Sequence, residues 1–481
     1  MYLTILIFSS PYIYPMTKTI NFKDLPAPKG KPIFGNLKEF AANEKHTVLE
    51  KWVNEVGSVL RISLAGKKFM VSGNADLNNE ILKSRPDKFR RFYKINEILE
   101  EVGIIGVFNA EGDQWKHHRK LTSEALNLKN VQGFLPTLHK VTERLMQRWA
   151  NKNGEIVDIQ KEMMRYTVDI TTNIAFGYDI NTLEKDGDVI QNHLEKIFPM
   201  INKRITSPIP LWRLIKSKDD KEFENALVEI EAFVQRFIDE AKERPTNHPE
   251  LKQNPTNFLE ALLVEQEKEG GLSDKEVFGN VFTILLAGED TTSNSISWII
   301  YYLCQNEKVV EKLRKEIQEV LGEDSLPSTN EQLTALKYTE AVAMEVMRLK
   351  PVTPNLYLQA LEDVTIQNYE IKKGMTVMMQ NKVPQTHNEH FSEPDAFIPD
   401  RWIPNGCPHL QNHSPQTIKV FGAGPRFCPG RNLAFHEMKM AIAMLLKNFD
   451  FTLEVDPKDV KEVFAFTMYP DNLKVSIKKR D

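Results

Sequence analysis

The sequence predicts one large domain that is mainly α-helical with small β-sheets. Its 481 residues show no internal repeat and no low-complexity linker that would divide the chain into separate domains. Hydrophobic residues make up 41% and charged residues 27%, a composition that supports a large core and excludes general disorder and a membrane-spanning bundle. Apolar residues recur at three-and-four spacing through most of residues 75–349, which is the helical period.

The first fifteen residues form an apolar segment that we place outside this domain. The run MYLTILIFSSPYIYP is interrupted by two serines and a proline and is shorter than the roughly 20 residues that cross a bilayer. No Lys or Arg precedes it, so a secretory signal is poorly supported. We divide the chain into an N-terminal segment, residues 1–23, and a domain of residues 24–481. The protein is expected in the cytoplasm, with peripheral membrane association through residues 1–15 as the alternative.

Local patterns predict the elements in chain order. Residues 24–36 carry three prolines and two glycines, which disfavour a helix and suit an extended entry segment. Alternating apolar residues between 59 and 71, broken around Gly66, predict a β-hairpin. Helical spacing is clearest at 141–150, 225–242 and 309–321, and strand patterns return at 364–377, 449–455 and 473–477.

Charge and cysteine content narrow the function. Lys and Arg number 62 against 66 Asp and Glu, a net charge of −4, so the chain has no basic excess with which to neutralise nucleic-acid phosphates. The three cysteines, Cys304, Cys407 and Cys428, include no C-x-x-C pair, which argues against a disulfide framework and a structural zinc site. A reducing compartment and no nucleic-acid partner are expected.

One cysteine stands in a sequence context that suits metal ligation. The segment FGAGPRFCPG, residues 421–430, places Cys428 in a glycine-rich and proline-rich loop just before an apolar helix at 432–446. Backbone N–H groups and the positive end of a helix favour thiolate over thiol, and Gly424 and Gly430 allow close approach of the backbone. The pattern by itself also fits a small buried cysteine or a phosphate-binding loop.

The same loop resembles a family signature. Phe421, Gly424, Arg426, Cys428 and Gly430 match F-x-x-G-x-R-x-C-x-G of the cytochrome P-450 family, the haem-thiolate monooxygenases. The resemblance implies that haem b is the cofactor, that the cysteine is the axial ligand of its iron, and that the thiolate favours O–O cleavage. It implies that the arginine of the signature faces a haem propionate. It also implies the family's triangular, mostly α fold from the entry segment to the end of the chain.

A long helix is predicted over residues 275–305, corresponding to roughly 45 Å. Its polar notch, AGEDTTSN, fits equally well two shorter helices divided by an N-cap at Asp290. Resemblance to the family's oxygen-binding helix favours the single helix. By that resemblance, Ala287 and Gly288 let a flat cofactor lie against the backbone, and Asp290 and Thr291 relay protons to dioxygen.

Glu345 and Arg348 are three residues apart and share a helix face. Such pairs add only about 0.2–0.5 kcal/mol and occur on many surfaces, so the spacing alone predicts no function. The pair and Arg401 in the segment FIPDRW resemble the family's E-x-x-R helix and its P-E-R-F-like segment. The resemblance implies that the three side chains form a structural network behind the haem.

Trp115 and Arg119 are four residues apart on a probable helix, with His117 and His118 between them. Adjacent histidines on a helix point about 100° apart and cannot easily share one ion. By resemblance to the family's W-x-x-x-R helix, Trp115 and Arg119 bind haem propionates. Where many relatives carry a further propionate partner, this chain has Leu358, so the remaining arginines are expected to contribute more to haem binding.

The reaction implied by the resemblance inserts one atom of dioxygen into an apolar small molecule such as a fatty acid, a terpenoid or a steroid-like compound. Because no flavin-binding or iron–sulfur motif is found, a separate ferredoxin or flavodoxin-type donor is expected, and the protein is expected to be a monomer. Lys116, Lys120 and Lys439 are candidates for the docking face. By position relative to the family motifs, the substrate wall is predicted to comprise Ile104, Val107, Phe282, Ala287, Thr291, Thr353, Leu356 and Met468.

Other functions share part of this pattern. A haem-thiolate peroxygenase or isomerase would use Cys428 but has less need of an acid and an alcohol that protonate dioxygen, so Asp290 and Thr291 favour the monooxygenase. A non-catalytic haem-binding protein would hold haem without turnover. A purely structural helical protein would hold no pigment.

Overall fold

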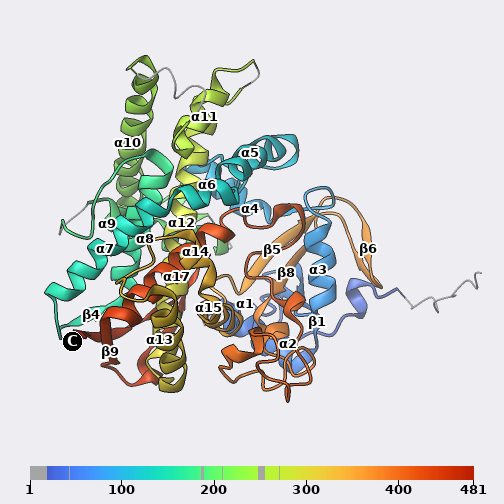
Figure 1. The fold of residues 1–481 in the computed structure, drawn as a ribbon. Helices are drawn as coiled ribbons and strands as arrows, with labels where there is room; N and C mark the ends of the chain where they lie inside the picture. The colour runs from blue at the N-terminus through green and yellow to red at the C-terminus, as the bar shows by residue number, and fades with distance from the viewer. Residues whose placement is uncertain are drawn as a thin grey trace, which may run out of the picture.

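Helices form most of the molecule and a β-rich part lies beside them (Figure 1). The computed structural model describes residues 19–42, 44–185, 189–207, 210–247, 255–269 and 271–480. The apolar segment 1–15 lies outside them. Within the described ranges, no helix is both long enough and apolar enough to cross a bilayer. The predicted mainly α fold with small sheets is confirmed.

The central helix α12 (Asp274–Leu303) is continuous through the polar notch. Ser273 caps its N-terminus in a capping box with Glu276. Within the notch, the hydroxyl of Thr291 donates to the carbonyl of Ala287 at 2.8 Å. These bonds satisfy polar side chains without interrupting the helix. The single predicted helix is therefore correct, and Asp290 is no N-cap.

The largest sheet has the strand order β1-β2-β8-β5-β3. β1 (Val59–Leu64) and β2 (Lys67–Ser72) form the predicted antiparallel hairpin, with φ of 49° at Ala65 and 82° at Gly66 in the turn. β8 (Thr376–Gln380) runs parallel to β2 and antiparallel to β5 (Asn355–Ala360), and β3 (Phe89–Arg91) closes the edge.

Three smaller sheets complete the β structure. The predicted strand run 364–377 is divided into a hairpin and the start of β8, because a left-handed residue at Gln367 turns the chain. The small sheets comprise β6 (Val364–Ile366) with β7 (Tyr369–Ile371), β4 (Ile156–Asp158) with β12 (Lys474–Lys479) and β9 (Phe449–Leu453), and β10 (Lys461–Phe464) with β11 (Met468–Asp471).

The remaining helices surround α12 and contain the three predicted helical segments in α7, α10 and α13. Their bounds are α1 (Leu37–Ala42), α2 (Lys45–Val56), α3 (Ala75–Lys83), α4 (Tyr93–Glu101), α5 (Gly112–Ala125), α6 (Leu128–Gly133), α7 (Leu135–Asn151), α8 (Ile159–Phe176), α9 (Val189–Thr206), α10 (Lys218–Asn247), α11 (Phe258–Gln266), α13 (Glu307–Leu321), α14 (Asn330–Ala335), α15 (Lys337–Leu349), α16 (Lys382–Gln385) and α17 (Arg431–Asn448). Short 3₁₀ helices include η1 (Phe22–Asp24), η2 (Leu211–Arg213), η4 (Pro399–Trp402), η5 (Pro415–Thr417), η6 (Gly424–Arg426) and η7 (Pro457–Asp459).

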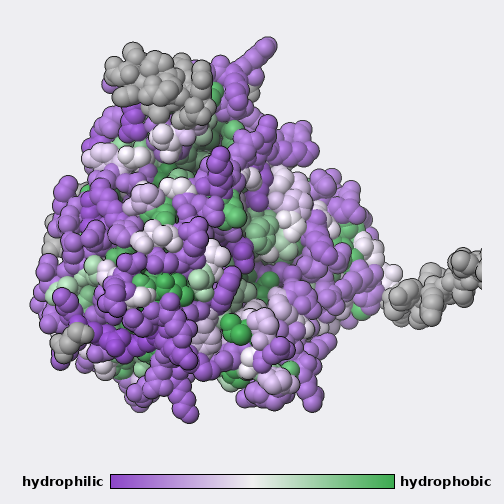
Figure 2. All heavy atoms as spheres, in the orientation of Figure 1, coloured by the Kyte–Doolittle hydropathy of each residue, from purple (hydrophilic) through white to green (hydrophobic). Residues whose placement is uncertain are grey.

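Two large apolar clusters meet along α12. One joins α7, α8, α13, α15 and α17 to its C-terminal half, around Trp149, Trp298 and Met440. The other joins α4, α9, α10 and α11 to its N-terminal half, around Phe223 and Phe282. The face seen in Figure 2 is mostly hydrophilic with scattered apolar residues, as expected when apolar faces of amphipathic helices turn inward. α12 thus carries its polar notch between two packed regions.

Candidate cofactor site

The loop before α17 holds Cys428 in a fixed geometry. The N–H of Cys428 donates to the carbonyl of Phe421 at 2.9 Å, which closes the loop on itself. Gly424 has φ of +67°, and a Cβ there would lie 2.7 Å from the carbonyl oxygen of Leu82 on α3. Glycine is required at this position by both the left-handed backbone and the close approach of α3.

The electrostatics of this loop prepare Cys428 to bind a cation. Protein surrounds the thiol closely enough that burial raises its pKa, while the backbone N–H groups of Gly430 and Arg431 and the charge of Arg119 act in the opposite direction. The residue still keeps some accessible surface. N–H groups that point at sulfur stabilise a thiolate, so the sulfur can act as a metal ligand once a cation offsets the burial.

A stripe of accessible residues runs along the middle of α12. Ala287 is exposed, and Ile284, Gly288 and Thr291 are partly exposed, although most of the helix around them is buried. The spacing of 284, 287, 288 and 291 places them on one face of the helix. α12 packs against α17, the helix that begins at the Cys428 loop. A central helix with one open face borders internal space, which is what a flat cofactor needs.

Gly288 has a different role from the one predicted. A Cβ at this position would lie 2.6 Å from the hydroxyl oxygen of Thr171 on α8. The missing side chain therefore allows α8 and α12 to pack closely. A Cβ at Gly288 would point toward α8, so its absence does not create space for a cofactor on the accessible face of α12. Ala287 supplies the small exposed side chain there.

Three arginines gather around one carboxylate beside the site. Arg426 donates from Nη2 to the carbonyl of Ala110 at 2.7 Å and forms an ion pair with Glu111. The other carboxylate oxygen of Glu111 accepts the backbone N–H of Arg91 at 3.0 Å. The pKa of Arg85 is lowered to about 10, mainly by burial and also by the charge of Arg426, while Glu111 acts in the opposite direction. One carboxylate cannot satisfy the three guanidinium groups.

Four donors of this cluster have no partner. Nε and Nη2 of Arg85 and Nε and Nη1 of Arg426 are buried and make no hydrogen bond within the described part of the chain. Buried charged donors without acceptors are costly, so such a cluster fits an anionic ligand. The two carboxylates of a haem would supply the missing acceptors, and the residues therefore fit this group. Sequence patterns did not identify Arg85, because it belongs to no motif and reaches Arg426 only through the fold.

Trp115 and Arg119 lie on α5 next to this cluster. The guanidinium carbon of Arg426 lies 4.6 Å from the ring centroid of Trp115, a cation–π arrangement that holds the arginine in place. Arg119 is half-buried, and its side chain makes no hydrogen bond within the described residues. Burial lowers the pKa of Arg119, whereas the nearby Cys428 raises it. Arg119 thus presents unpaired side-chain donors close to the thiol.

The two histidines of α5 have structural roles. The ring of His118 is buried, with Nε2 3.2 Å from Glu276 and Nδ1 3.3 Å from Asn280, both on α12. His117 is 4.0 Å from Glu265. The described residues contain no group of three or more His, Cys, Asp and Glu side chains that could hold a metal ion.

Asp290 and Thr291 face different surroundings. Asp290 is buried and accepts hydrogen bonds from the hydroxyl of Thr467 and from Nδ2 of Asn294 at 3.0 Å. Asn294 also donates to Thr467 at 2.9 Å. Burial raises the pKa of Asp290 to about 6, opposed by the bonds from Thr467 and Asn294. Thr291 lies on the open stripe, and no hydrogen bond joins it to Asp290. Asn294 and Thr467 are contacts that the motif did not reveal.

The predicted network around Glu345 is present. Its carboxylate accepts two bonds from Arg348, at 2.8 and 2.9 Å, and one from Arg401 at 3.0 Å. It also accepts the indole N–H of Trp402 at 2.9 Å and the backbone N–H of Ile398 at 2.9 Å. The remaining arginine donors bond to carbonyls of the segment before η4 and of α16. This network ties α15 to that segment.

The predicted substrate wall divides into two groups. Val107, Thr353 and Leu356 keep accessible surface. Ile104, Phe282 and Met468 are at most 2% exposed and are packed inside the apolar clusters, so these three line no accessible space. Partly exposed aromatic residues lie near them: the ring centroids of Phe108 and Phe466 are 5.9 Å apart, and Phe466 stacks on Phe198 at 5.4 Å.

Lys439 does not belong to a docking face. Its ammonium is buried, pairs with Glu340 at 2.6 Å and donates to the carbonyl of Leu333 at 3.2 Å. The prediction is wrong because α17 turns this side chain toward α14 and α15 and not toward solvent. Lys116 is exposed and paired with Asp113 at 2.9 Å, and Lys120 is exposed.

Known proteins resemble this chain along most of its length. A family model described as Cytochrome P450 matches residues 25–477. The chain is 28% identical over 443 residues to the protein LUTEIN DEFICIENT 5, chloroplastic, of Arabidopsis thaliana, covering 88% of this chain and 72% of that protein. It is 25% identical to Cytochrome P450 94A1 of Vicia sativa, covering 94% of this chain and 91% of the relative.

Two further matches, one a curated relative and one a solved structure, differ in how much of their own length this chain covers. The self-sufficient cytochrome P450 monooxygenase CYP505U2 of Exserohilum turcicum is 28% identical over 95% of this chain, which spans only 42% of that protein's length. The solved structure of the cytochrome P450DA heme domain superposes with a TM-score of 0.83 at 22% identity, covering 97% of this chain and 99% of that one. This structural likeness concerns the fold.

Proposed function

This chain belongs to the cytochrome P450 family and is therefore a haem b monooxygenase, and from that premise we propose which residues hold the cofactor, which class of substrate is oxidised and where the electrons come from. The proposed substrate is an apolar small molecule, and the proposed electron source is a separate protein. When bound, haem supplies the redox centre at which dioxygen is reduced and one oxygen atom reaches the substrate. The steps below concern the chain's own residues.

Cys428 is the proposed axial ligand, and Arg85, Arg119 and Arg426 are the proposed partners of the propionates. The observation that carries this assignment is the set of buried guanidinium donors without acceptors, in a cluster that includes the motif arginine two residues from Cys428. The ring of Trp115 packs against the guanidinium of Arg426. A propionate that accepts these donors would replace the missing hydrogen bonds by charge-assisted ones, which are the stronger class.

A spectrum tests the ligand. The reduced, haem-loaded protein is exposed to carbon monoxide, and the strongly red-shifted Soret absorption of a thiolate complex is expected. Cys428→Ser should lose that absorption, while Cys407→Ser, which changes a cysteine outside the loop, should keep it. An unshifted Soret band in the intact protein would remove the assignment of Cys428.

Thr291 is proposed to move protons at the open face of α12. Its hydroxyl lies on the accessible stripe and in the resting arrangement donates to the carbonyl of Ala287, from which it can rotate toward a ligand. Asp290 is proposed as the proton source behind it, since its pKa of about 6 lets it gain and lose a proton near neutrality. Their side chains would be connected through solvent or movement, because Asp290 is bonded to Thr467 and Asn294.

Removing the hydroxyl tests this role. Thr291→Ala is expected to retain haem while electrons supplied to the enzyme appear as hydrogen peroxide and not as product. Ser295→Ala, which removes a hydroxyl one turn further along α12, serves as the matched control because Ser295 donates to the carbonyl of Thr291 and lies buried. Full coupling of electron consumption to product in Thr291→Ala would exclude the relay.

The electron donor is proposed to dock near the exposed lysines of α5. Lys116 and Lys120 are accessible, and complementary charge accelerates the encounter with an acidic partner. The alternative source is a reductase within the same chain, as in the relative from Fusarium oxysporum that is named a bifunctional cytochrome P450/NADPH–P450 reductase. Exchanging both lysines for glutamate should slow reduction by an acidic ferredoxin or flavodoxin, whereas Lys218→Glu on α10 should not. An unchanged rate in the double variant would reject this docking face.

A further inference from the structure

The carboxyl group of Asp290 belongs to a closed ring of three hydrogen bonds. The hydroxyl of Thr467 donates to Oδ2 of Asp290, and Nδ2 of Asn294 donates to Oδ1 at 3.0 Å. Nδ2 of Asn294 also donates to Oγ1 of Thr467 at 2.9 Å. All three side chains are buried. Both carboxyl oxygens of Asp290 are therefore occupied, while the hydroxyl of Thr291 donates to the carbonyl of Ala287.

The chemistry of the three groups fixes the direction of these bonds. An amide NH₂ group can only donate, so Oγ1 of Thr467 accepts from Asn294 and its single hydrogen points to Asp290. Donors of this kind favour the ionised carboxyl. Thr467 and Asn294 accordingly lower the pKa of Asp290, against burial, which raises it to about 6. Among the described residues, no charged side chain contributes to this pKa, the neighbouring Glu289 included.

Thr467 reaches the ring of bonds from a separate part of the chain. It lies in the three-residue turn 465–467 that joins β10 to β11. The N–H of Ala465 donates to the carbonyl of Thr467 at 3.1 Å, and the N–H of Met468, after the turn, donates to the carbonyl of Val352 at 2.8 Å. Because the Thr467 hydroxyl is carried by this turn, a movement of the turn changes its distance from α12.

The same turn carries an accessible aromatic ring. The side chain of Phe466 is partly exposed, whereas that of Thr467 is buried. The ring of Phe466 stacks on Phe198 with 5.4 Å between centroids, and the ring of Phe108 lies 5.9 Å away. One residue of the turn thus borders accessible apolar space, and the next one bonds to the buried carboxyl of Asp290.

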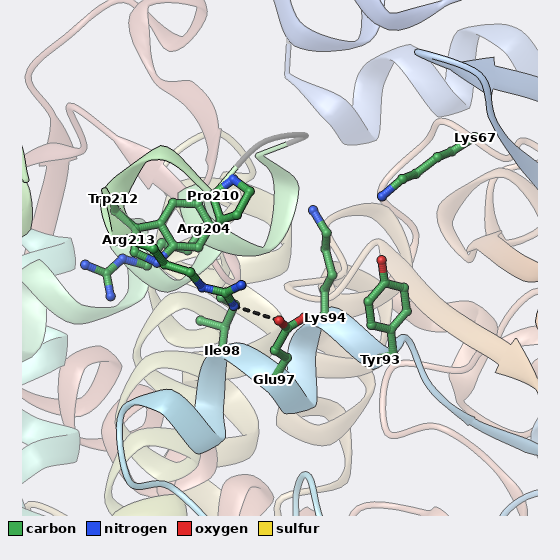
Figure 3. Close-up of a pocket in the computed structure, with 9 residues that line it drawn as sticks. All are labelled: Lys67, Tyr93, Lys94, Glu97, Ile98, Arg204, Pro210, Trp212 and Arg213. Atoms are coloured by element: carbon green, nitrogen blue, oxygen red, sulfur yellow. Dashed lines mark hydrogen bonds and ion pairs between the residues drawn. The ribbon is translucent and has the colours of Figure 1, made fainter. Parts of the chain in front are cut away.

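Of the two stacked rings, Phe466 is the one that can be displaced. Phe198 is 6% exposed and belongs to the apolar cluster at the N-terminal half of α12. It lies on α9, and η2, which follows that helix, is tied to α4 by the ion pair of Arg213 with Glu97 at 2.7 Å. Figure 3 shows this pair at the pocket between α4 and η2. A ligand that enters the stack therefore moves the short turn and not α9.

We propose that Thr467 is a positioning residue of the proton relay, which holds the Asp290 carboxyl away from Thr291 until an apolar ligand displaces the ring of Phe466 and moves the turn. The carboxyl is then held only by Asn294, on its own helix, and can turn toward the open face of α12. The inference rests on the proposed roles of Asp290 and Thr291. The link from Phe466 to Asp290 can be measured without turnover.

Infrared spectroscopy of the haem-loaded, ligand-free protein tests this link by following the absorption of the protonated Asp290 carboxyl against pH. Asp290→Asn identifies that absorption by its loss, since burial also raises the pKa of Glu437. Thr467→Val removes a bond to the carboxylate and should raise the titration midpoint by about one to two pH units. Thr467→Ser should restore the midpoint. Thr172→Val, which removes a buried hydroxyl bonded to the carbonyl of Val168 at 2.7 Å, should leave it unchanged.

Removal of the aromatic ring tests the part played by Phe466. Phe466→Ala loosens the turn and should raise the same midpoint, by less than Thr467→Val does. When the two substitutions are combined, the turn no longer has a hydroxyl through which to act on Asp290. The double variant should therefore have the midpoint of Thr467→Val alone, which is the non-additivity of two residues that act through one contact. Additive shifts, or no shift in Phe466→Ala, would overturn the link to the ring.

The remaining outcomes separate this inference from the proposed function. An unchanged midpoint in Thr467→Val, or a raised midpoint that Thr467→Ser fails to restore, would overturn the positioning role of the Thr467 hydroxyl. If Thr291→Ala stays fully coupled while the infrared midpoints shift as expected, the relay falls and the link from Phe466 to Asp290 stands. If Thr291→Ala loses coupling and the midpoints do not shift, the relay stands and positioning by Thr467 falls.

Discussion

Two arginine sites, one around Glu345 and one around Glu111, differ in how completely their hydrogen-bond donors are satisfied. Around Glu345, every guanidinium nitrogen of Arg348 and Arg401 donates to a carboxylate or a carbonyl. Around Glu111, four guanidinium nitrogens of Arg85 and Arg426 are buried without a partner among the residues that the structure describes. The two sites share residue types, so composition alone does not distinguish them.

The difference identifies their roles. A buried ion network that is saturated by the protein has nothing left to offer a ligand, and it joins α15 to the segment before η4. A buried cluster with spare donors is unfavourable until an acceptor arrives, so folding of the protein leaves binding energy available for that acceptor. Satisfied donors therefore mark the scaffold, and unsatisfied donors mark the binding site.

The largest expected effect comes from breaking the saturated site. Glu345→Ala leaves the guanidiniums of Arg348 and Arg401 buried without their carboxylate, which is expected to destabilise the protein by about 3–5 kcal/mol. Urea unfolding measures the loss. Glu331→Ala, which removes an exposed carboxylate on α14, should stay within about 0.5 kcal/mol. A loss below about 1 kcal/mol for Glu345→Ala would show that the network contributes little to the scaffold.

Asp290 extends the comparison of the two arginine sites to a buried carboxyl group whose hydrogen-bond partners are neutral. Its pKa of about 6 in the folded protein is above the ordinary value of 3.8, so folding is favoured by protonation. The stabilisation is complete below about pH 4 and is lost as the pH rises through about 6, amounting to about 3 kcal/mol. Asp290→Asn cannot ionise, so between pH 4 and 7 it should lose correspondingly less stability than the wild type.

The experiment measures the free energy of unfolding of the wild type and of Asp290→Asn as a function of pH, and the difference between the two is compared across the pH range. Burial also raises the pKa of Asp169 to about 6, although bonds from Thr182 and Leu183 oppose it. The variant is therefore expected to retain part of the pH dependence through Asp169. Parallel curves for wild type and Asp290→Asn would contradict the buried, partly protonated state of Asp290.

Patterns that are local in sequence predicted much of the molecule. The hairpin before α3 follows from alternation, whereas the continuity of α12 and the Glu345 network were predicted only through their resemblance to family motifs. Prediction failed where the neighbours come from distant segments. The surface around Gly288 is supplied by α8, the partners of Lys439 by α14 and α15, and the partner of Asp290 by the turn before β11. None of these contacts produces a periodic pattern in the sequence from which it could have been predicted.

The substrate wall shows the same limit more strongly. Ile104, Phe282 and Met468 were placed by their position relative to motifs, yet accessible surface depends on a side chain's direction as well as its position. Phe108 and Phe466 come from separate loops, and only the fold brings their rings together.

The final prediction concerns the site around Glu111, whose donors are not all satisfied. Here a substitution is expected to leave the stability of the haem-free protein unchanged or to raise it, whereas Glu345→Ala is expected to lower stability. Arg85→Met removes a buried guanidinium that lacks partners, so the haem-free protein should be as stable as the wild type or more stable. The same change removes a charged donor to a propionate, worth about 1.5–3 kcal/mol, and should accelerate haem release by about tenfold or more. Transfer of haem to apomyoglobin measures the release, and urea unfolding without haem measures the stability. Arg90→Met is the control, because Nε and Nη2 of Arg90 already donate to Gln359 at 2.9 and 2.8 Å. This substitution should not alter haem release. If Arg85→Met destabilises the haem-free protein and leaves haem release unchanged, Arg85 belongs with the scaffold and the distinction between the two arginine sites fails.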